Sequence, residues 1–445
     1  MPMPFQAALR PGVSPRELWA WAMYDFANSG YTTVVITALF NAYFVAVVAG
    51  NAPWATFAWT AALSFSYALI VFSAPLIGAY ADLRAAKKKL LGVSTAGCIL
   101  FTALLYFAQP DTLWLAILCV ILSNFFFGSG ENLIAAFLPE LARPRAMGRV
   151  SGWGWSLGYA GGLVTLALCL GYVAWAEAQG QTAAQFVPAT MLITAGMFAL
   201  ASIPTFLVLR ERAVPCATPG LQIRDTRLRD AWREVGRTLR NLRQFADLRR
   251  FLLCSLFYQA GIQAVITLTA VYAGQAMNFT TQQTLLLVLV VNITAAVGAF
   301  LFGRFQDRVG HVLSIALTLA GWIVTILLAW AAREPTLFWV AANVAGLCLG
   351  ASQSAGRALV GLLAPPSRAA EFFGLWGLAV KLASIAGPLT YGAATWLTGG
   401  DHRQALLITG SYFVVGLILL SGVNAARGRR AAMRAERLAR MAGLA

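Results

Sequence analysis

The sequence has few charged residues. Asp, Glu, Lys and Arg make up 11% of its 445 residues, whereas a soluble domain usually carries about a quarter. Acidic residues are scarcest, with 17 Asp and Glu against 33 Lys and Arg, and there are only two His. This composition leaves too little polar surface to cover one or two soluble domains of that length.

Motifs for metal, redox and nucleotide chemistry are also missing. The six Cys form no CxxC pair and no His cluster accompanies them, which excludes the usual zinc and thiol-redox motifs. No P-loop, HExxH motif or Ser-His-Asp arrangement occurs, and His311 and His402 are isolated. We therefore expect no cofactor, no metal site and no enzymatic activity.

Apolar residues, in contrast, make up 59% of the chain, enough for about a dozen membrane spans of about 20 residues each. We predict an all-α polytopic membrane protein with 12 transmembrane helices in two six-helix repeats. The domains would be residues 1–210, a cytoplasmic linker at 211–249, residues 250–427 and a basic tail at 428–445. The predicted spans are 18–48, 54–81, 88–108, 112–138, 150–175, 186–209, 250–275, 282–303, 311–331, 336–363, 371–397 and 403–426.

The net charge of +16 has two interpretations, a nucleic-acid surface or a topology signal. The basic residues gather in alternate loops, in the linker and in the tail, which is the positive-inside pattern. We therefore predict cytoplasmic N- and C-termini and no nucleic-acid partner. The preference for Arg over Lys favours a GC-rich genome and a bacterial inner membrane. We expect a monomer.

The linker and the tail are the two basic stretches outside the spans. In the linker, apolar residues recur at spacings of three and four between Arg residues, which predicts an amphipathic helix that lies on the inner membrane surface or packs under the bundle. The functional alternative is a calmodulin-like partner site. These apolar residues are Leu228, Trp232, Val235, Leu239, Leu242 and Phe245. The tail is basic and Ala-rich, and anionic membrane lipids are its expected partner.

An internal repeat relates the two halves. The second span ends with Gly78 and Asp82, and the eighth ends with Gly303 and Asp307, both in the pattern G-x-x-x-D with bases beyond. A parallel repeat of six helices is the organisation of major-facilitator transporters. The Gly allows helix ends to approach, and the carboxylate can face a helix N-terminus or pair with Arg. We predict either a cytoplasmic gate or simple topology anchoring, formed by Gly78, Asp82, Arg84, Gly303, Asp307 and Arg308.

Several motifs spread over both halves resemble the vacuole-effluxer-like family of the major facilitator superfamily, whose eukaryotic members are autophagy-related effluxers. They are ELWAWAMYDFANSGY at 17–31, AFLPEL at 136–141, GRVSGWGWSLGY at 148–159, EFFG at 371–374, Lys381 and the Gly387-Pro388 pair. The resemblance implies small-solute transport, with amino acids as the leading substrate class. Two departures are Ala85-Ala86 within the first gate motif and Gly356, where the family usually has Ser.

Four ionisable residues fall inside predicted spans, where charges are costly and often functional. They are Asp25, Glu131, Arg357 and Lys381. We predict that Asp25 or Glu131 couples transport to protons and that the two cations neutralise a carboxylate. The alternative is a pair of permanent ion pairs that hold helices together.

Uncharged polar residues on the same spans complete the predicted path, either as substrate ligands or as bridges between helices. They are Tyr24, Asn28, Asn132, Gln259, Gln263 and Gln353. The leading prediction is thus a secondary transporter of a small polar solute, working by alternating access and coupled to protons. A lipid flippase or scramblase on the same fold is the alternative.

Overall fold

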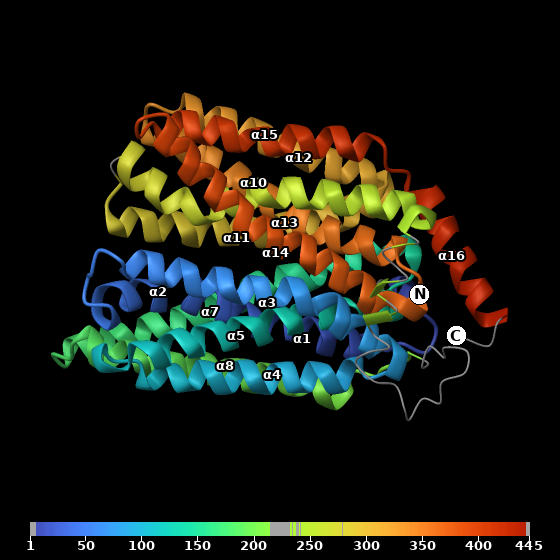
Figure 1. Ribbon diagram of the computed structural model, residues 1–445, viewed down its shortest axis with the longest axis horizontal. Helices are drawn as coiled ribbons and strands as arrows, with labels where there is room; N and C mark the ends of the chain where they lie inside the picture. The colour runs from blue at the N-terminus through green and yellow to red at the C-terminus, as the bar shows by residue number, and fades with distance from the viewer. Residues whose placement is uncertain are drawn as a thin grey trace.

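Two helix bundles lie side by side in the computed structural model, with their long axes parallel (Figure 1). The structure describes residues 6–213, 242–277 and 279–441, and five positions between 213 and 242. Nearly all of this part is helical, with one isolated β-bridge between Leu9 and Ala142. We call the end that carries Arg210 and the final helix the linker end.

The N-terminal half contains residues 15–208. Its first helix combines α1 (Pro15–Tyr31) and α2 (Phe40–Tyr43) with two π-helical stretches, Thr32–Ala38 and Phe44–Val48. Such stretches are rare within helices, and apolar run length alone predicted one regular helix here. The remaining helices are α3 (Ala55–Arg84), α4 (Lys87–Leu104), α5 (Leu113–Ala135), the short α6 (Leu138–Leu141), α7 (Met147–Ala178) and α8 (Ala183–Val208).

The C-terminal half repeats the arrangement. Its helices are α10 (Ala246–Met277), α11 (Thr281–Val309), α12 (His311–Ala331), α13 (Pro335–Leu363), α14 (Ala369–Leu397) and α15 (His402–Ser421). Within the described residues, 11 helices are long and apolar enough to cross a membrane, and α10, with 32 residues, stands where the seventh span is predicted. The predicted fold class is confirmed.

Local sequence explains where several helices begin and end. Ser14 caps α1, with its hydroxyl accepting from the Glu17 N–H, and Pro15 follows at the first helical position. Asp401 caps α15 in the same way. The helix α3 ends at Ala85, whose φ of 49° is left-handed. Because α3 and α11 run to Arg84 and Val309, beyond the predicted ends, both motif carboxylates lie on last helical turns rather than in loops.

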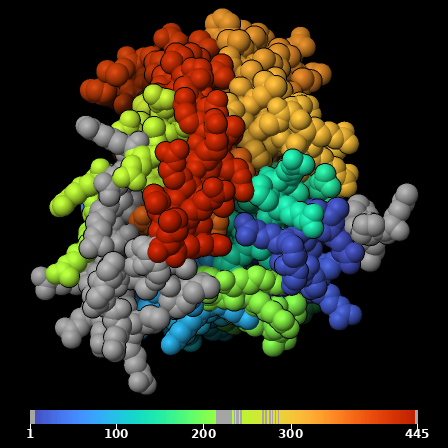
Figure 2. Space-filling view, turned by 90° about the vertical axis from the view of Figure 1, so that its right-hand side faces the viewer, coloured from blue at the N-terminus to red at the C-terminus, as the bar shows by residue number. Residues whose placement is uncertain are grey.

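The two basic stretches differ in how far they can be compared with the predictions. Most of the predicted linker helix lies outside the described residues, although Val235 packs on α3 beside Leu76. The tail forms a further helix, α16 (Ala425–Met441), which begins before the predicted boundary at 428. It lies across the linker end rather than along the sides of the bundle (Figure 2).

The halves meet along two helix pairs, α3 with α14 and α7 with α11. Glycine permits this approach at the linker end. A methyl group at Gly78 would overlap the carbonyl oxygen of Ala370, and one at Gly374 would overlap that of Ala74. Gly152 stands in the same relation to Ala299 in the other pair. The linker end is therefore closed, with backbone packed on backbone.

Candidate functional site

The first predicted charge pair joins the two halves. Arg357 of α13 donates from Nη1 to Oδ2 of Asp25 on α1 at 2.7 Å. Its Nε donates to the Ser151 hydroxyl at 3.1 Å, and its Nη2 donates to the Ser151 carbonyl at 2.8 Å. Asp25 and Arg357 are 8% and 3% exposed, so this is a buried ion pair in which the cation has additional partners.

Aromatic rings enclose the Arg357 guanidinium. Its carbon lies 4.8 Å from the centre of the Trp21 ring and 5.3 Å from that of Trp155, within the range of cation–π attraction. Gly154 leaves the room that the pair occupies, because a methyl group there would overlap both the Asp25 carboxylate and the guanidinium. The N-terminal half thus forms a fitted receptor for a cation from the other half.

The second pair also joins the halves, but it is more open. Lys381 of α14 donates to Glu131 of α5 at 3.1 Å, with its ammonium 5.6 Å from the centres of the Tyr67 and Phe127 rings. The Glu131 side chain is 28% exposed, against 11% for that of Asp25. Glu131 is therefore the intramembrane carboxylate more accessible to a solute or a proton.

The predicted polar residues of the N-terminal half divide. Tyr24 lies inside the N-terminal bundle, where its hydroxyl bonds to that of Thr95 at 2.9 Å. Asn28 is buried, and its side chain makes no hydrogen bond to another described residue. Asn132 does reach the boundary between halves, since a methyl group at Gly377 of α14 would overlap its amide.

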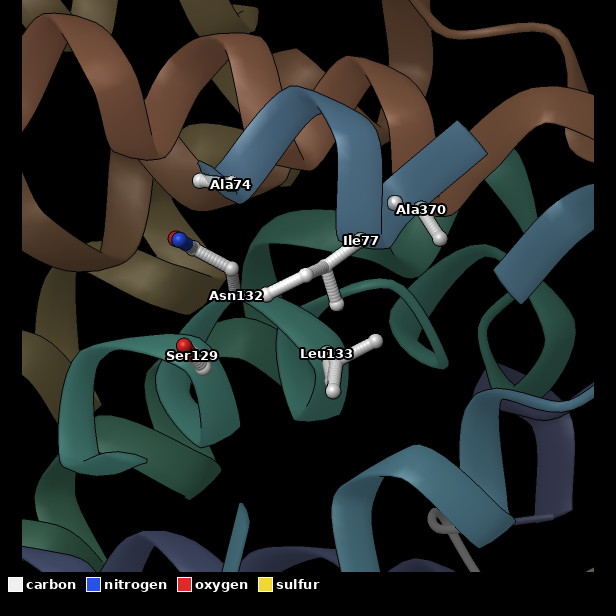
Figure 3. A pocket seen from close by; sticks show the side chains of 7 residues that line it. Ala74, Ile77, Ser129, Asn132, Leu133 and Ala370 are labelled. Atoms are coloured by element: carbon white, nitrogen blue, oxygen red, sulfur yellow. The ribbon is translucent and has the colours of Figure 1, made fainter. Parts of the chain in front are cut away.

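A small pocket lies beside Asn132, between α3, α5 and the start of α14. Figure 3 shows Ser129, Asn132 and Leu133 of α5 facing Ala74 and Ile77 of α3. The amide nitrogen of Asn132 is buried without a hydrogen-bond partner in the described structure. The pocket thus brings a polar group to the surface where the two halves meet.

In the C-terminal half, Gln259 and Gln353 bond to each other, with Nε2 to Oε1 distances of 2.9 and 3.3 Å. They bridge α10 and α13, and Gln263 is half-buried one turn further along α10. Gly356 is explained by Tyr258, whose hydroxyl would lie 2.6 Å from an added methyl group. A larger side chain there would require the Tyr258 side chain to shift.

The two motif carboxylates bind helix N-termini across the boundary between halves. Asp82 accepts from the backbone N–H groups of Ala370 and Glu371 on α14, at 3.2 and 2.8 Å. Asp307 accepts from those of Gly148 and Arg149 on α7, at 2.9 and 3.1 Å. A carboxylate is favourable there because the helix dipole is positive at its N-terminus. Despite Ala85-Ala86 in the first motif, the two halves form the same contact.

The two predicted gate arginines lie on the last turns of α3 and α11. Arg84 lies over the Tyr80 ring of its own helix, at 5.2 Å. Arg308 is exposed at the end of α11 and forms no ion pair in the described part. Near the first motif the buried cation is instead Lys87, which pairs with Glu140.

Several residues that surround the two cations could not be predicted from residue type. Trp21, Ser151 and Trp155 enclose Arg357, and Tyr67 and Phe127 flank Lys381. Three of these five residues fall in the motifs at 17–31 and 148–159, so the motifs indicated this region of the chain. The three are uncharged, and a selection by charge therefore did not include them. Among the described residues no cluster of His, Cys, Asp or Glu could hold a metal ion.

Comparison with known sequences gives one family and related transporters. The profile of the family described as vacuole effluxer Atg22 like matches residues 55–433. An uncharacterized MFS-type transporter, YxiO of Bacillus subtilis, is 27% identical over 91% of this chain and 94% of its own length. Autophagy-related protein 22-1 of Aspergillus fumigatus is 27% identical over 69% of this chain, which spans 54% of that protein.

Solved structures share the fold at low identity. The human organic anion transporter MFSD10 has a TM-score of 0.71 at 17% identity, covering 92% of this chain and 100% of that one. The proton:xylose symporter XylE has a TM-score of 0.67 at 15% identity, with coverage of 90% and 94%. These similarities establish the major-facilitator fold for this chain.

Proposed function

The chain belongs to the vacuole effluxer Atg22-like family of membrane transporters, and on that premise we propose that it moves a small polar solute by alternating access coupled to protons. The observation that carries this proposal is that both intramembrane ion pairs join the two halves. In alternating access the halves rock against each other. A pair shared between them can therefore form in one state and break in the other.

The two pairs have different proposed roles. Glu131 carries the proton, because it is the more exposed carboxylate and a single cation, Lys381, holds it. Protonation would remove its charge and release Lys381. Asp25 and Arg357 form a structural lock, because Arg357 has Ser151 and two rings as further partners. The cost of burying charge is larger at the Asp25–Arg357 pair than at the Glu131–Lys381 pair.

Asp82 and Asp307 form the inner gate of the proposed cycle. Each binds the N-terminal turn of a helix in the other half, so each contact must open before a solute can leave at that end. The basic loops favour the cytoplasm for the linker end. The structure is then a state closed towards the cytoplasm.

Amino acids are the proposed substrate class. Lys381 and Glu131 offer a cation and an anion 3.1 Å apart at the boundary between halves. The carboxylate of a zwitterion could bind Lys381 while its ammonium group binds Glu131. Asn132 adds an amide without a partner beside them. The match to the family described as vacuole effluxer Atg22 like supports transport of a small solute.

The test is efflux from proteoliposomes loaded with the twenty amino acids, with and without a pH gradient, analysed by mass spectrometry. We expect Glu131→Gln to transport without responding to the gradient, because it cannot release a proton. Asp25→Asn serves as the matched control, and it should keep the gradient response while transporting more slowly. Retention of the gradient response in Glu131→Gln would refute the assignment of the proton to Glu131.

A parallel arm separates the lipid-flippase alternative. The same proteoliposomes would carry a fluorescent phospholipid, whose exposure to external dithionite reports movement between leaflets. Movement of lipid without movement of any amino acid would refute the proposed substrate class.

A further inference from the structure

The C-terminal helix α16 is fixed to the linker end by its small and acidic residues. Gly428, Ala432 and Glu436 recur every four residues and are buried. Gly428 packs so closely that a methyl group there would lie 2.5 Å from a Leu363 side-chain carbon. The opposite face, with Arg430, Arg434 and Arg437, is exposed. Figure 2 shows α16 crossing the face of the molecule at this end.

Glu436 connects α16 to the segment that precedes α14. Its Oε2 accepts from the Ser367 backbone N–H at 3.1 Å and from the Ser367 hydroxyl at 2.7 Å. Glu436 is 4% exposed, so these bonds are protected from solvent. Ser367 lies three residues before Ala370, whose N–H donates to the Asp82 carboxylate. Glu436 and Asp82 thus hold the same short stretch of chain, residues 367–371.

We propose that Glu436 is a positioning residue of the inner gate, because it holds Ser367 and thereby the first turn of α14 where Asp82 can bind it. The C-terminal helix is then a third component of the gate, beside the two motif carboxylates. This inference rests on the proposed alternating access, since it assumes that the linker end opens.

The loop before α14 explains why such a component is useful. The first turn of α14, which Asp82 binds, follows the loop between α13 and α14, in which Pro365 and Pro366 precede Ser367. Proline supplies no N–H to fix a loop, so Ser367 offers the N–H that an external acceptor can hold. Glu436 also interacts electrostatically with Arg10, which donates to the Ala142 carbonyl of the N-terminal half at 3.3 Å. The contact therefore lies where both halves meet.

The test measures how often the linker end opens. A cysteine replaces Ser129, which is 3% exposed and lines the pocket beside the gate. The parent protein has Cys216 replaced by Ser, since the other five cysteines are buried. Inside-out membrane vesicles are treated with a membrane-impermeant maleimide, and the labelling rate is compared among variants. Thermal unfolding of each purified variant is recorded in parallel.

Glu436→Ala should raise the labelling rate about tenfold, the effect expected when a hydrogen bond to a charged group is lost from the closed state alone. Glu436→Gln should restore much of the slow rate, because its amide oxygen still accepts from Ser367. Arg437→Ala, one position along on the exposed face, should label like the parent. A purely structural role for Glu436 would lower thermal stability without changing labelling, which would overturn the proposal.

Asp82→Ala is the reference for an opened gate. If it labels fast and Glu436→Ala does not, the positioning role is wrong while alternating access stands. If neither variant changes labelling, both proposals are overturned. If Glu436→Ala labels fast but no solute moves in proteoliposomes, the positioning role stands and the proposed substrate class is wrong.

Discussion

Removing Arg357 should destabilise the protein more than removing its partner Asp25. The two substitutions to compare are Arg357→Met, which keeps side-chain length, and Asp25→Asn, which keeps side-chain shape. The ion pair is the only hydrogen-bonded contact of the Asp25 carboxylate in the described structure, whereas Arg357 also holds two oxygens of Ser151. The two partners therefore differ in what each leaves behind.

The expected magnitudes follow from these contacts. Arg357→Met leaves a buried carboxylate with no cation, which should cost about 3–5 kcal/mol of unfolding free energy. Asp25→Asn leaves a guanidinium with the Ser151 acceptors and the Trp21 and Trp155 rings, so the loss should be nearer the ~1.5–3 kcal/mol of one hydrogen bond to a charged group. The double variant should lose less than the sum, because neither charge remains buried alone.

The assay is reversible unfolding in mixed micelles with increasing sodium dodecyl sulfate, followed by far-ultraviolet circular dichroism. The matched control is the cycle of Glu131→Gln with Lys381→Met, where the more exposed carboxylate should give a smaller coupling energy. Additive losses at Asp25 and Arg357 would refute a direct pair between the halves. An equal or larger loss for Asp25→Asn would refute the supporting role of Ser151 and the two rings.

Two further predictions concern glycines. Gly78→Ala should loosen the linker end, because the new methyl group would overlap a backbone carbonyl of α14. The control is Gly92→Ala, whose new methyl group meets its nearest atom at 3.7 Å and should be neutral. The maleimide labelling described above measures the difference, and equal labelling of the two variants would contradict the packing. Gly356→Ser should lower the free energy of unfolding by about 1–3 kcal/mol, because the new side chain overpacks against the Tyr258 hydroxyl. Adding Tyr258→Phe should recover part of that loss in the same unfolding assay. An unchanged stability of Gly356→Ser would show that the site has room.

Most of the fold could be predicted from the sequence because lipid imposes a strong rule. Each span must satisfy its own backbone, so apolar run length alone locates the helices. The π-helical stretches from Thr32 to Val48 were not predictable in this way, since they depend on how neighbouring helices pack. The helix α16 was missed because its buried face consists of Gly428, Ala432 and Glu436, which carry little apolar character.

The candidate site was only partly predictable. The search for charges within spans identified Asp25, Glu131, Arg357 and Lys381, since a buried charge is conspicuous in an apolar run. It could not give the pairing, because residue spacing fixes depth along a helix and not the rotation of one helix towards another. The structure pairs each acid with a base of the other half. For the same reason the sequence placed Tyr24 on the path, although it faces Thr95 inside its own bundle.

The internal repeat extends to how each half is closed at the linker end. Glu17, in the first turn of α1, accepts from the Arg210 N–H at 3.0 Å and from the Arg212 guanidinium. Asp247, in the first turn of α10, accepts from the Asn424 N–H at 2.8 Å and from the Arg427 guanidinium at 2.6 Å. In each half, an acid at the start of the first helix holds the chain that leaves the last helix.

The contacts of Glu17 and Asp247, which we call clamps, have a mechanical consequence. The hydrogen bond that Arg212 donates to Glu17 raises the pKa of Arg212, and the one that Arg427 donates to Asp247 raises the pKa of Arg427, so both cations stay charged at neutral pH. Each clamp lies within one half, whereas the contacts of Asp82 and Asp307 lie between halves. Opening the linker end must break the second kind and can leave the first intact. The clamps therefore allow each bundle to move as a unit, which is what a rocking mechanism requires.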